Sequence, residues 1–400
     1  MERSIHSGTR TEGIAGLLWD LVAIHSVNPS FPNGGGESDL ASWLVSYCRS
    51  LGLAVETQEV FPGRPNVLAR LPASSSRGVL LFEAHLDTVS FGTQAMESPD
   101  IRGGRLYGRG ACDTKGSLAA MLVALERLTK RTDELAADVL LLGSVDEESS
   151  GAGANHYVAN GGHADGAVVG EPTGLQIVVA HKGCVRFRVT AKGRAAHSSK
   201  PDQGSNAIYT LSDVIQHLRA GLFTTAEQRT HDRVGSPTWS IGVIKGGVSV
   251  NIVPDSCSID IDYRSLPGET AESVLAEVDE ALDELRTVTP GIEIEREAPF
   301  LVSWPLDTPS SSAVVQAALR AQQTISGTRP LTGVPYGSDA SLLAVVGGIP
   351  SVVVGPGDIS VAHGPDEYVD LKELEEAADL YEAIALAFDP SDTGAMEAIT

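Results

Sequence analysis

Four short apolar runs, separated by segments with helical spacing, constrain the fold of this 400-residue chain more than any other feature. They cover residues 79–84, 138–145, 166–169 and 351–354. Continuous apolar runs of this length are typical of strands buried on both faces, and strands that alternate with helices pair in parallel. We therefore expect an α/β domain with a mostly parallel sheet and helices on both of its faces.

Polar side chains follow these runs at or beyond their carboxyl ends. In chain order they are His85, Asp87, Glu147, Glu148, Glu171 and His363, and a strand-to-helix loop would bring Asp113 to the same place. Ligands gather at this edge in open α/β sheets, so these side chains are expected to lie close together. Imidazoles and carboxylates without thiolates suit a hydrolytic zinc ion or a related divalent ion.

Each of these residues also has an ordinary structural explanation. The explanations are a strand end for His85 and Asp87, a helix cap for Asp113, a solvated pair for Glu147 and Glu148, and a loop position for His363. These ordinary explanations are weakened because four separate apolar strands each lead to one of these polar groups. A shared metal site is the interpretation that explains all of them together.

Composition excludes several classes of partner. The net charge of −23 disfavours nucleic acid and anionic membrane surfaces, which require clustered lysine and arginine. The four cysteines are scattered without a CxxC pair, which favours a reducing compartment. The N-terminus lacks an apolar signal region, and no segment approaches the ~18 apolar residues of a membrane span. We expect a cytoplasmic protein with no membrane partner.

The chain is too long for one comfortable core, so two domains are expected. Between residues 184 and 298 the pattern changes to strand, helix, strand, strand, helix, strand, which is the order of a ferredoxin-like domain. The first pattern resumes near residue 300. The prediction is a discontinuous domain, 1–183 and 299–400, with an α+β domain, 184–298, inserted in it.

A series of sequence blocks runs through nearly the whole chain: AHLDTV, LYGRGACDTKGS, DEESSGAGA, GEPTGLQIVVAHKG, GRAAHSSKPDQGSNAI, GVSVNIVPDSCSIDIDYRSLPGET and GPGDISVAHGPDEYV. In order and interval they resemble the M20 family of metallo-aminoacylases and exopeptidases, within its acetylornithine deacetylase and succinyl-diaminopimelate desuccinylase branch. The resemblance implies a zinc-exopeptidase-like catalytic domain with an inserted lid and dimerisation domain.

The resemblance also implies a ligand set for two divalent metal ions per chain, Zn²⁺ first and Co²⁺ as the alternative. His85 and Glu171 would hold one ion, Glu148 and His363 the other, and Asp113 would bridge them. The Asp113–Thr114 peptide bond would be cis, as the corresponding bond is in the family.

Catalytic roles follow from the same resemblance. Glu147 would be the general base, although adjacency alone does not say whether Glu147 or Glu148 points inward. Asp87 lies two residues after His85, so both side chains would leave the same face of a strand, and Asp87 would accept the second imidazole N–H.

The inserted domain would supply further site residues. His197 would donate to the oxyanion, or else be a surface loop histidine. Arg264 would bind the substrate carboxylate, or else form a structural ion pair with Asp260 or Asp262. The remaining predicted pocket residues are Asn251, Gly337 and Ser338.

The sequence therefore predicts a dinuclear metallohydrolase that cleaves the amide of an N-acyl amino acid, with an acetylornithine-type compound as the leading substrate. A succinyl-diaminopimelate desuccinylase, a dipeptidase and a glutamate-releasing carboxypeptidase are alternatives within the family. A non-catalytic metal-binding scaffold is disfavoured because ligands, base and His197 are all present. The resemblance also implies a homodimer through the inserted domain, in which His197 of one chain would enter the cleft of the other; the sequence itself does not say whether His197 acts in its own chain or in its partner.

Overall fold

The computed structural model describes residues 13–91 and 98–392 and divides into two compact units. The first unit comprises the chain up to Val179, Thr308–Thr332 and the chain from Ser338 onward. The second comprises Ala180–Asp307 and Gly333–Gly337. The second unit thus extends beyond 184–298 at both ends and includes a short later segment. The catalytic and lid roles of the two stretches stay predictions.

A mixed sheet forms the centre of the first unit, in the order β1-β2-β6-β3-β7-β18, and continues through β8 to the short strands β16 and β17. The bounds are β1 (Ala54–Phe61), β2 (Arg64–Leu71), β3 (Val79–His85), β6 (Asp138–Ser144), β7 (Gly166–Val169), β8 (Val178–His181), β16 (Leu306–Asp307), β17 (Thr332–Val334) and β18 (Ser351–Val353). The central strands β6, β3, β7 and β18 are parallel, and they contain the four apolar runs. The antiparallel strands lie toward the edges.

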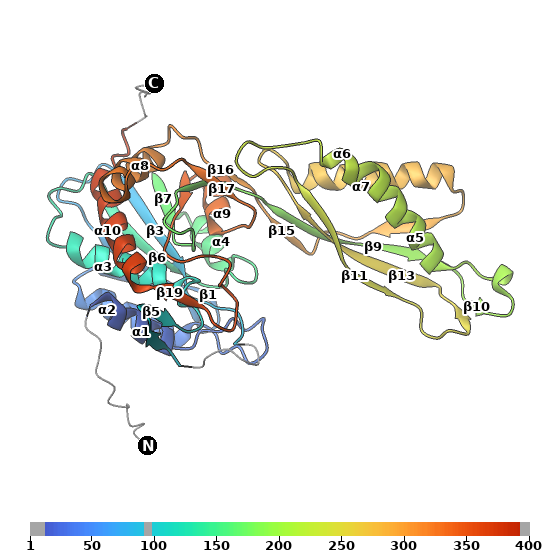
Figure 1. Ribbon diagram of the computed structural model, residues 1–400, viewed down its shortest axis with the longest axis horizontal. Helices are drawn as coiled ribbons and strands as arrows, with labels where there is room; N and C mark the ends of the chain where they lie inside the picture. The colour runs from blue at the N-terminus through green and yellow to red at the C-terminus, as the bar shows by residue number, and fades with distance from the viewer. Residues whose placement is uncertain (1–12, 92–97, 393–400) are drawn as a thin grey trace, which may run out of the picture. The chain divides into compact units, whose positions relative to one another are not determined.

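Helices cover both faces of this sheet, as Figure 1 shows. One face carries α1 (Ile14–Ala23), α2 (Ser38–Ser50), α3 (Lys115–Leu128), α8 (Ala313–Ser326) and α10 (Leu371–Ala387), and the other carries α4 (Ala152–Ala159) and α9 (Asp339–Val345). Side chains alternate between faces along a strand, so Leu80 and Phe82 join the core under the first set while Leu81 is buried on the opposite face. These features confirm the predicted α/β class.

A small separate sheet, which the sequence did not predict, has the order β19-β5-β4. Its strands are β4 (Asp100–Arg102), β5 (Arg105–Tyr107) and β19 (Tyr368–Asp370). The β5/β19 pairing brings together two chain segments that are far apart in sequence. Such short strands carry too little periodic signal to be identified from hydropathy.

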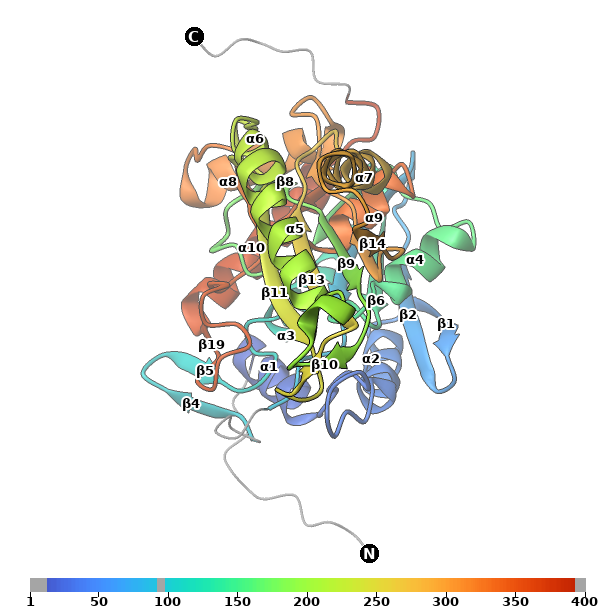
Figure 2. The same ribbon diagram turned by 90° about the vertical axis from the view of Figure 1, so that its right-hand side faces the viewer.

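The second unit is an antiparallel sheet with two long helices on one face, visible in Figure 2. The bounds are β9 (Cys184–Lys192), β10 (Ala196–His197), a 3₁₀ turn (Pro201–Gln203), α5 (Ala207–Leu218), a π-helical turn (Arg219–Phe223), α6 (Thr224–Ala226), β11 (Thr238–Gly246), β12 (Ile252–Val253), β13 (Ser256–Arg264), α7 (Ala271–Val288), β14 (Glu293–Arg296) and β15 (Leu301–Ser303). The sheet order is β11-β13-β9-β14, with β15 also pairing with β9.

The two faces of this sheet differ in chemistry because side chains alternate along each strand. Phe187 and Ile261 pack under α5 and α7 in the buried cluster. On the opposite face, Arg188 pairs with Asp260 at 2.6 Å across neighbouring strands. Within the described ranges of the chain, no helix has the length and apolar character needed to cross a membrane.

Candidate metal centre

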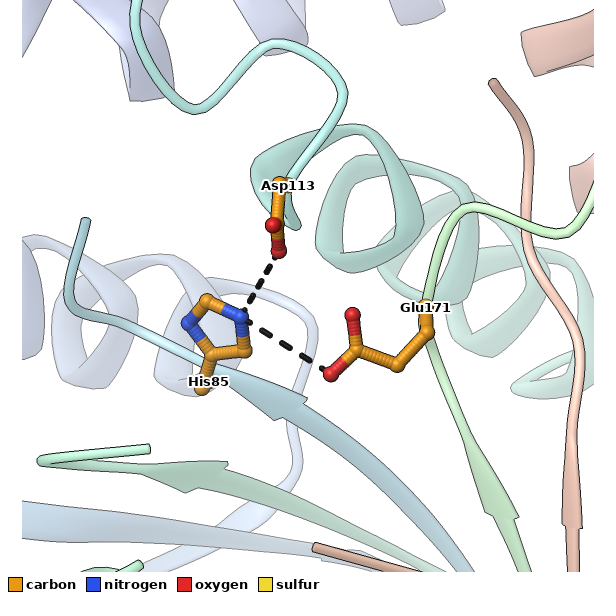
Figure 3. A group of neighbouring side chains, drawn as sticks. All are labelled: His85, Asp113 and Glu171. Carbon is orange, nitrogen blue, oxygen red and sulfur yellow. Dashed lines mark hydrogen bonds and ion pairs between the residues drawn. The ribbon is translucent and has the colours of Figure 1, made fainter. Parts of the chain in front are cut away.

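Three of the predicted ligands converge at the carboxyl edge of the parallel strands (Figure 3). His85 is the last residue of β3, Glu171 lies just beyond β7, and Asp113 precedes α3. Strands β3 and β7 are parallel neighbours, so their carboxyl ends lie side by side. The fold thus brings together side chains that are 28 and more residues apart in sequence.

The first group is compact and buried. The Nε2 atom of His85 lies 3.0 Å from Oδ1 of Asp113 and 3.9 Å from Oε1 of Glu171. All three residues are buried, and one potential ligand atom from each lies within 4.8 Å of the others. This spacing fits a single ion bound between an imidazole and two carboxylates.

The second group shares Asp113 with the first. The other carboxylate oxygen of Asp113, Oδ2, lies 3.1 Å from Nε2 of His363, and Oε1 of Glu148 lies 3.0 Å from the same nitrogen. Asp113 therefore offers one oxygen to each group. This is the arrangement required of a carboxylate that bridges two ions.

The donor chemistry fits zinc or a related divalent ion, because the two groups contain only imidazoles and carboxylates. Cys112 is adjacent to Asp113 in sequence but belongs to neither group. Its Sγ donates instead to the carbonyl of Asp358 at 3.5 Å, and burial raises the pKa of its thiol. A buried neutral thiol of this kind is a poor competitor for the metal.

Two expectations about the Asp113 loop are decided by the backbone. The Asp113–Thr114 bond is cis, as the family resemblance implied. Helix α3 begins at Lys115 with Thr114 at its N-cap position and no side-chain cap. Helix capping therefore does not explain Asp113.

The site concentrates acidic groups away from water. Burial, followed by the charges of Asp113 and other neighbours, raises the pKa of Glu171 well above its ordinary value. Burial alone would lower the pKa of His85, but the hydrogen bond to Asp113 and the other carboxylates raise it well above its ordinary value. The residues thus hold protons that a divalent cation would replace.

Asp87 holds the turn that carries both glutamates. Its Oδ1 and Oδ2 accept the backbone N–H groups of Glu147 and Glu148, each at 3.1 Å. The Nδ1 atom of His85 lies 2.9 Å from the backbone carbonyl of Asp87 and 3.6 Å from its carboxylate. The second imidazole nitrogen is therefore closest to the main chain of Asp87, because the carboxylate is engaged by the turn.

The model of peptidase family M20/M25/M40 matches residues 81–387, more than half of the chain. The chain belongs to this family. It is 32% identical over 382 residues to the acetylornithine deacetylase of Proteus mirabilis (strain HI4320), which covers 91% of this chain and 94% of that protein. It is 33% identical over 355 residues to the acetylornithine deacetylase of Pectobacterium carotovorum subsp. carotovorum (strain PC1), covering 85% and 88% of the two chains.

A solved structure with a similar fold is the aminopeptidase PepT of Bacillus cereus ATCC 10987, with a TM-score of 0.77 and 25% identity. The match covers 94% of this chain and 97% of that one. These relationships make the protein a metal-dependent hydrolase that acts on amide bonds. The recognition of the M20 family from sequence blocks is thereby confirmed.

Sequence reasoning missed a buried network behind the glutamate turn of this M20 enzyme. Nδ2 of Asn28 donates to Oδ2 of Asp87 at 2.7 Å and to Oδ1 of Asp146 at 2.9 Å. Arg64 donates to the same Asp146 oxygen at 2.8 Å and binds Glu37 through two hydrogen bonds of 2.6 Å. These partners lie 27 to 118 residues apart, so no local spacing in the sequence indicates that they meet.

A second set of missed residues also belongs to this M20 domain. Ser144 donates its hydroxyl to Glu83 at 2.5 Å and lies 3.4 Å from Oδ2 of Asp339, the first residue of α9. One hydroxyl proton serves only one carboxylate, so the second must carry its own proton or remain unpaired. Burial raises the pKa of Glu83 to about 7 and that of Asp339 well above its ordinary value.

The remaining predicted M20 site residues lie mostly in the second unit. His197 is exposed in β10, and its Nδ1 lies 2.8 Å from the Ser199 hydroxyl. Arg264 ends β13 and donates to Oδ1 of Asp262 at 2.8 Å, so the ion pair named as its alternative role is present. The other three predicted residues are Asn251, which is exposed, Gly337 at the end of the second unit, and Ser338 at the N-cap position of α9 in the first. Their roles in binding substrate stay predictions.

Proposed function

We propose that this M20 enzyme removes the acyl group from an N-acyl amino acid, with an acetylornithine-type compound as the leading substrate. The observation that carries the proposal is the pair of histidine and carboxylate groups that share Asp113, next to the turn that bears Glu147. The two acetylornithine deacetylases at 32% and 33% identity support this substrate class.

In the proposed site, His85 and Glu171 would hold one divalent ion, Glu148 and His363 would hold the other, and Asp113 would be shared between them. Zn²⁺ is the first candidate and Co²⁺ the second, on the basis of the nitrogen and oxygen donor set. Divalent ions held by these residues would supply Lewis acidity for the scissile carbonyl and for the attacking water.

Glu147 is the proposed general base. Burial, together with nearby charges that include Asp339 and Glu148, raises the pKa of Glu147 well above its ordinary value. A carboxylate with a raised pKa takes a proton from water and returns it to the leaving group near neutral pH. Here the proton would pass from the attacking water to the amide nitrogen, so that a carboxylate and a free amine are released.

Residues of the second unit are further proposed members of the site. Arg264 would bind the substrate carboxylate, His197 would donate to the oxyanion, and the pocket would include Asn251, Gly337 and Ser338. We further propose a homodimer in which His197 reaches the partner's cleft. The support is β11, an edge strand of its sheet that carries exposed Val243 and Ile244 and is suited to pairing with a second copy.

The deciding experiment is an activity screen of protein that has been stripped with a chelator and reloaded with Zn²⁺ or Co²⁺. The substrates are acetylornithine, other acetyl-amino acids, succinyl-diaminopimelate, dipeptides and an acyl-glutamate. We expect acetylornithine-type compounds to be hydrolysed fastest and the stripped protein to be inactive. Faster hydrolysis of another of these substrates would identify one of the family alternatives instead.

The same screen tests the mechanism. Full activity in thoroughly stripped protein would refute the metal-dependent reaction. Binding of two ions without hydrolysis of any of the substrates would favour a non-catalytic scaffold. Comparing each acid with its amide in an Arg264→Lys variant tests the carboxylate contact, because loss of a planar bidentate partner should affect only substrates that carry the acid.

A further inference from the structure

The segments that carry Asp113 and His363 run side by side in the first unit. Strand β5 pairs with β19, with Tyr107 opposite Tyr368. Beyond the ladder, the N–H of Gly108 donates to the carbonyl of Glu367 at 3.0 Å. Figure 1 shows the two strands adjacent to each other below α10. The ladder therefore sets the register of the two ligand-bearing loops, one of which follows β5 while the other precedes β19.

Just beyond the ladder, toward the candidate ligands, Arg109 and Glu367 form a buried ion pair. Nη1 of Arg109 donates to Oε2 of Glu367, and the side chains are only 4% and 2% exposed. Neither residue belongs to the ligand groups or to the predicted pocket. Burying an ion pair costs desolvation free energy, so a purely stabilising role is a weak explanation for it.

Each member of the pair also binds the main chain of the opposite loop. Nη2 of Arg109 donates to the carbonyl oxygens of His363 and Gly364, both at 3.2 Å. Oε1 of Glu367 accepts the N–H groups of Cys112 and Asp113, both at 3.1 Å. The arginine on one segment thus holds the His363 loop, and the glutamate on the other holds the Asp113 loop.

His363 needs such support more than the other candidate ligands. Its side chain is 49% exposed, whereas the side chains of His85 and Asp113 are 2% and 7% exposed. It lies outside every helix and strand, with φ at 62°, a left-handed conformation that is uncommon for residues other than glycine. Apart from the contacts of its Nε2 with Asp113 and Glu148, its imidazole is therefore positioned by what holds its main chain.

We propose that Arg109 and Glu367 form a positioning pair that preorganises the Asp113, Glu148 and His363 group for its ion. The group of His85, Asp113 and Glu171 depends less on Arg109, because the guanidinium hydrogen bonds reach only the His363 side. This inference rests on the proposed dinuclear site. Both residues act through the ligands, since their contacts are with main chain and with each other.

The expected effect is selective. Replacing the partners that orient metal ligands typically weakens metal binding by about 10–100-fold. Arg109→Lys keeps the charge, but a single ammonium does not reproduce a planar fork that binds a carboxylate and two carbonyls. We therefore expect the second ion to bind about 10–100-fold more weakly in Arg109→Lys, and the first ion to bind as in the wild type.

The experiment is a Co²⁺ titration of chelator-stripped full-length protein, followed by calorimetry and by visible absorbance. Wild type should bind two equivalents, and Arg109→Lys and Arg109→Met should retain the tighter one and weaken the other. Activity at limiting metal should fall in the variants and return with excess metal. Glu367→Gln, which keeps an acceptor for the Cys112 and Asp113 N–H groups, provides a milder variant if the arginine variants do not fold.

Arg127→Met is the matched control. Arg127 also joins distant parts of the chain, through ion pairs with Asp379 at 2.6 Å and Glu382 at 3.3 Å, but on the surface between α3 and α10. It should bind both ions as the wild type does. Equal weakening of both ions in the Arg109 and Glu367 variants, or unchanged affinity with lowered stability alone, would overturn the positioning role. Failure of the wild type to bind two ions would overturn the dinuclear function and this inference with it.

Discussion

Asn28 is the residue of the buried network whose replacement is most informative. Its Oδ1 accepts the N–H of Ser30 at 2.9 Å, which orients the amide so that Nδ2 faces two carboxylates. Nδ2 donates one hydrogen to Asp87 at 2.7 Å and the other to Asp146 at 2.9 Å. Asn28→Asp preserves the shape of the side chain but replaces both donors with an acceptor.

The cost follows from the two lost hydrogen bonds. Hydrogen bonds to charged groups contribute about 1.5–3 kcal/mol each, so losing both should lower the free energy of unfolding by about 3–6 kcal/mol. The new carboxyl would lie between two buried carboxylates, which raises its pKa in the folded state. The destabilisation should therefore grow as pH rises above the unfolded value of about 3.9, and shrink where the new carboxyl is protonated and donates one bond.

The assay is thermal unfolding of metal-free protein at pH 5 and pH 8. For domains of about 150–250 residues, 1 kcal/mol shifts Tm by about 2–4 °C, so a loss of at least about 6 °C is expected at pH 8. Asn155→Asp on the exposed side of α4 makes the same chemical change and should stay within about 0.5 kcal/mol of wild type. A loss at Asn28 that matched this control, or that was equal at both pH values, would refute the reasoning.

Two further predictions concern carboxylates of the same domain. Glu147→Gln should keep both ions and lower kcat by at least about 10²–10⁴-fold, whereas Glu148→Gln should lose an ion, as measured by elemental analysis and turnover; the opposite pattern would reverse the two assignments. Burial holds the pKa of Asp339 well above its ordinary value, so the folded state keeps a proton that the unfolded chain releases, and stability falls as pH rises from about 4. Asp339→Asn should therefore be more stable than wild type at pH 8 but not at pH 4 in denaturant titrations of metal-free protein, and an equal difference at both would contradict this.

The parts of the fold that the sequence predicted are those with a local signal. Strands β3, β6, β7 and β18 are continuous apolar runs, because the helices on both faces leave no polar side to the sheet. His85 and Glu171 follow such runs directly, which is why the fold class alone indicated that they meet. The same pattern indicated Glu148 and His363, which lie on irregular segments, and the family resemblance implied the ion that each would hold.

The supporting residues had no such signal. Arg109 meets Glu367 across 258 residues, and Asn28 meets Asp146 across 118. A single polar residue in a loop has the same appearance in sequence whether it is solvated or buried against a distant partner. Strands β5 and β19, whose pairing brings the Arg109 and Glu367 segments together, have three residues each, too few for a periodic pattern.

The adjacent glutamates illustrate how tertiary contacts give two neighbouring side chains different surroundings. Asp87 accepts both of their N–H groups, and Asp146, the residue before them, has φ at 71° and is held by Asn28 and Arg64. With the turn held on both sides, the side chain of Glu148 reaches His363 at 3.0 Å. Among the described residues, Glu148 belongs to a ligand group and Glu147 does not. The proposed ligand and the proposed base can stand next to each other in sequence because Asp87 holds the main chain of both residues.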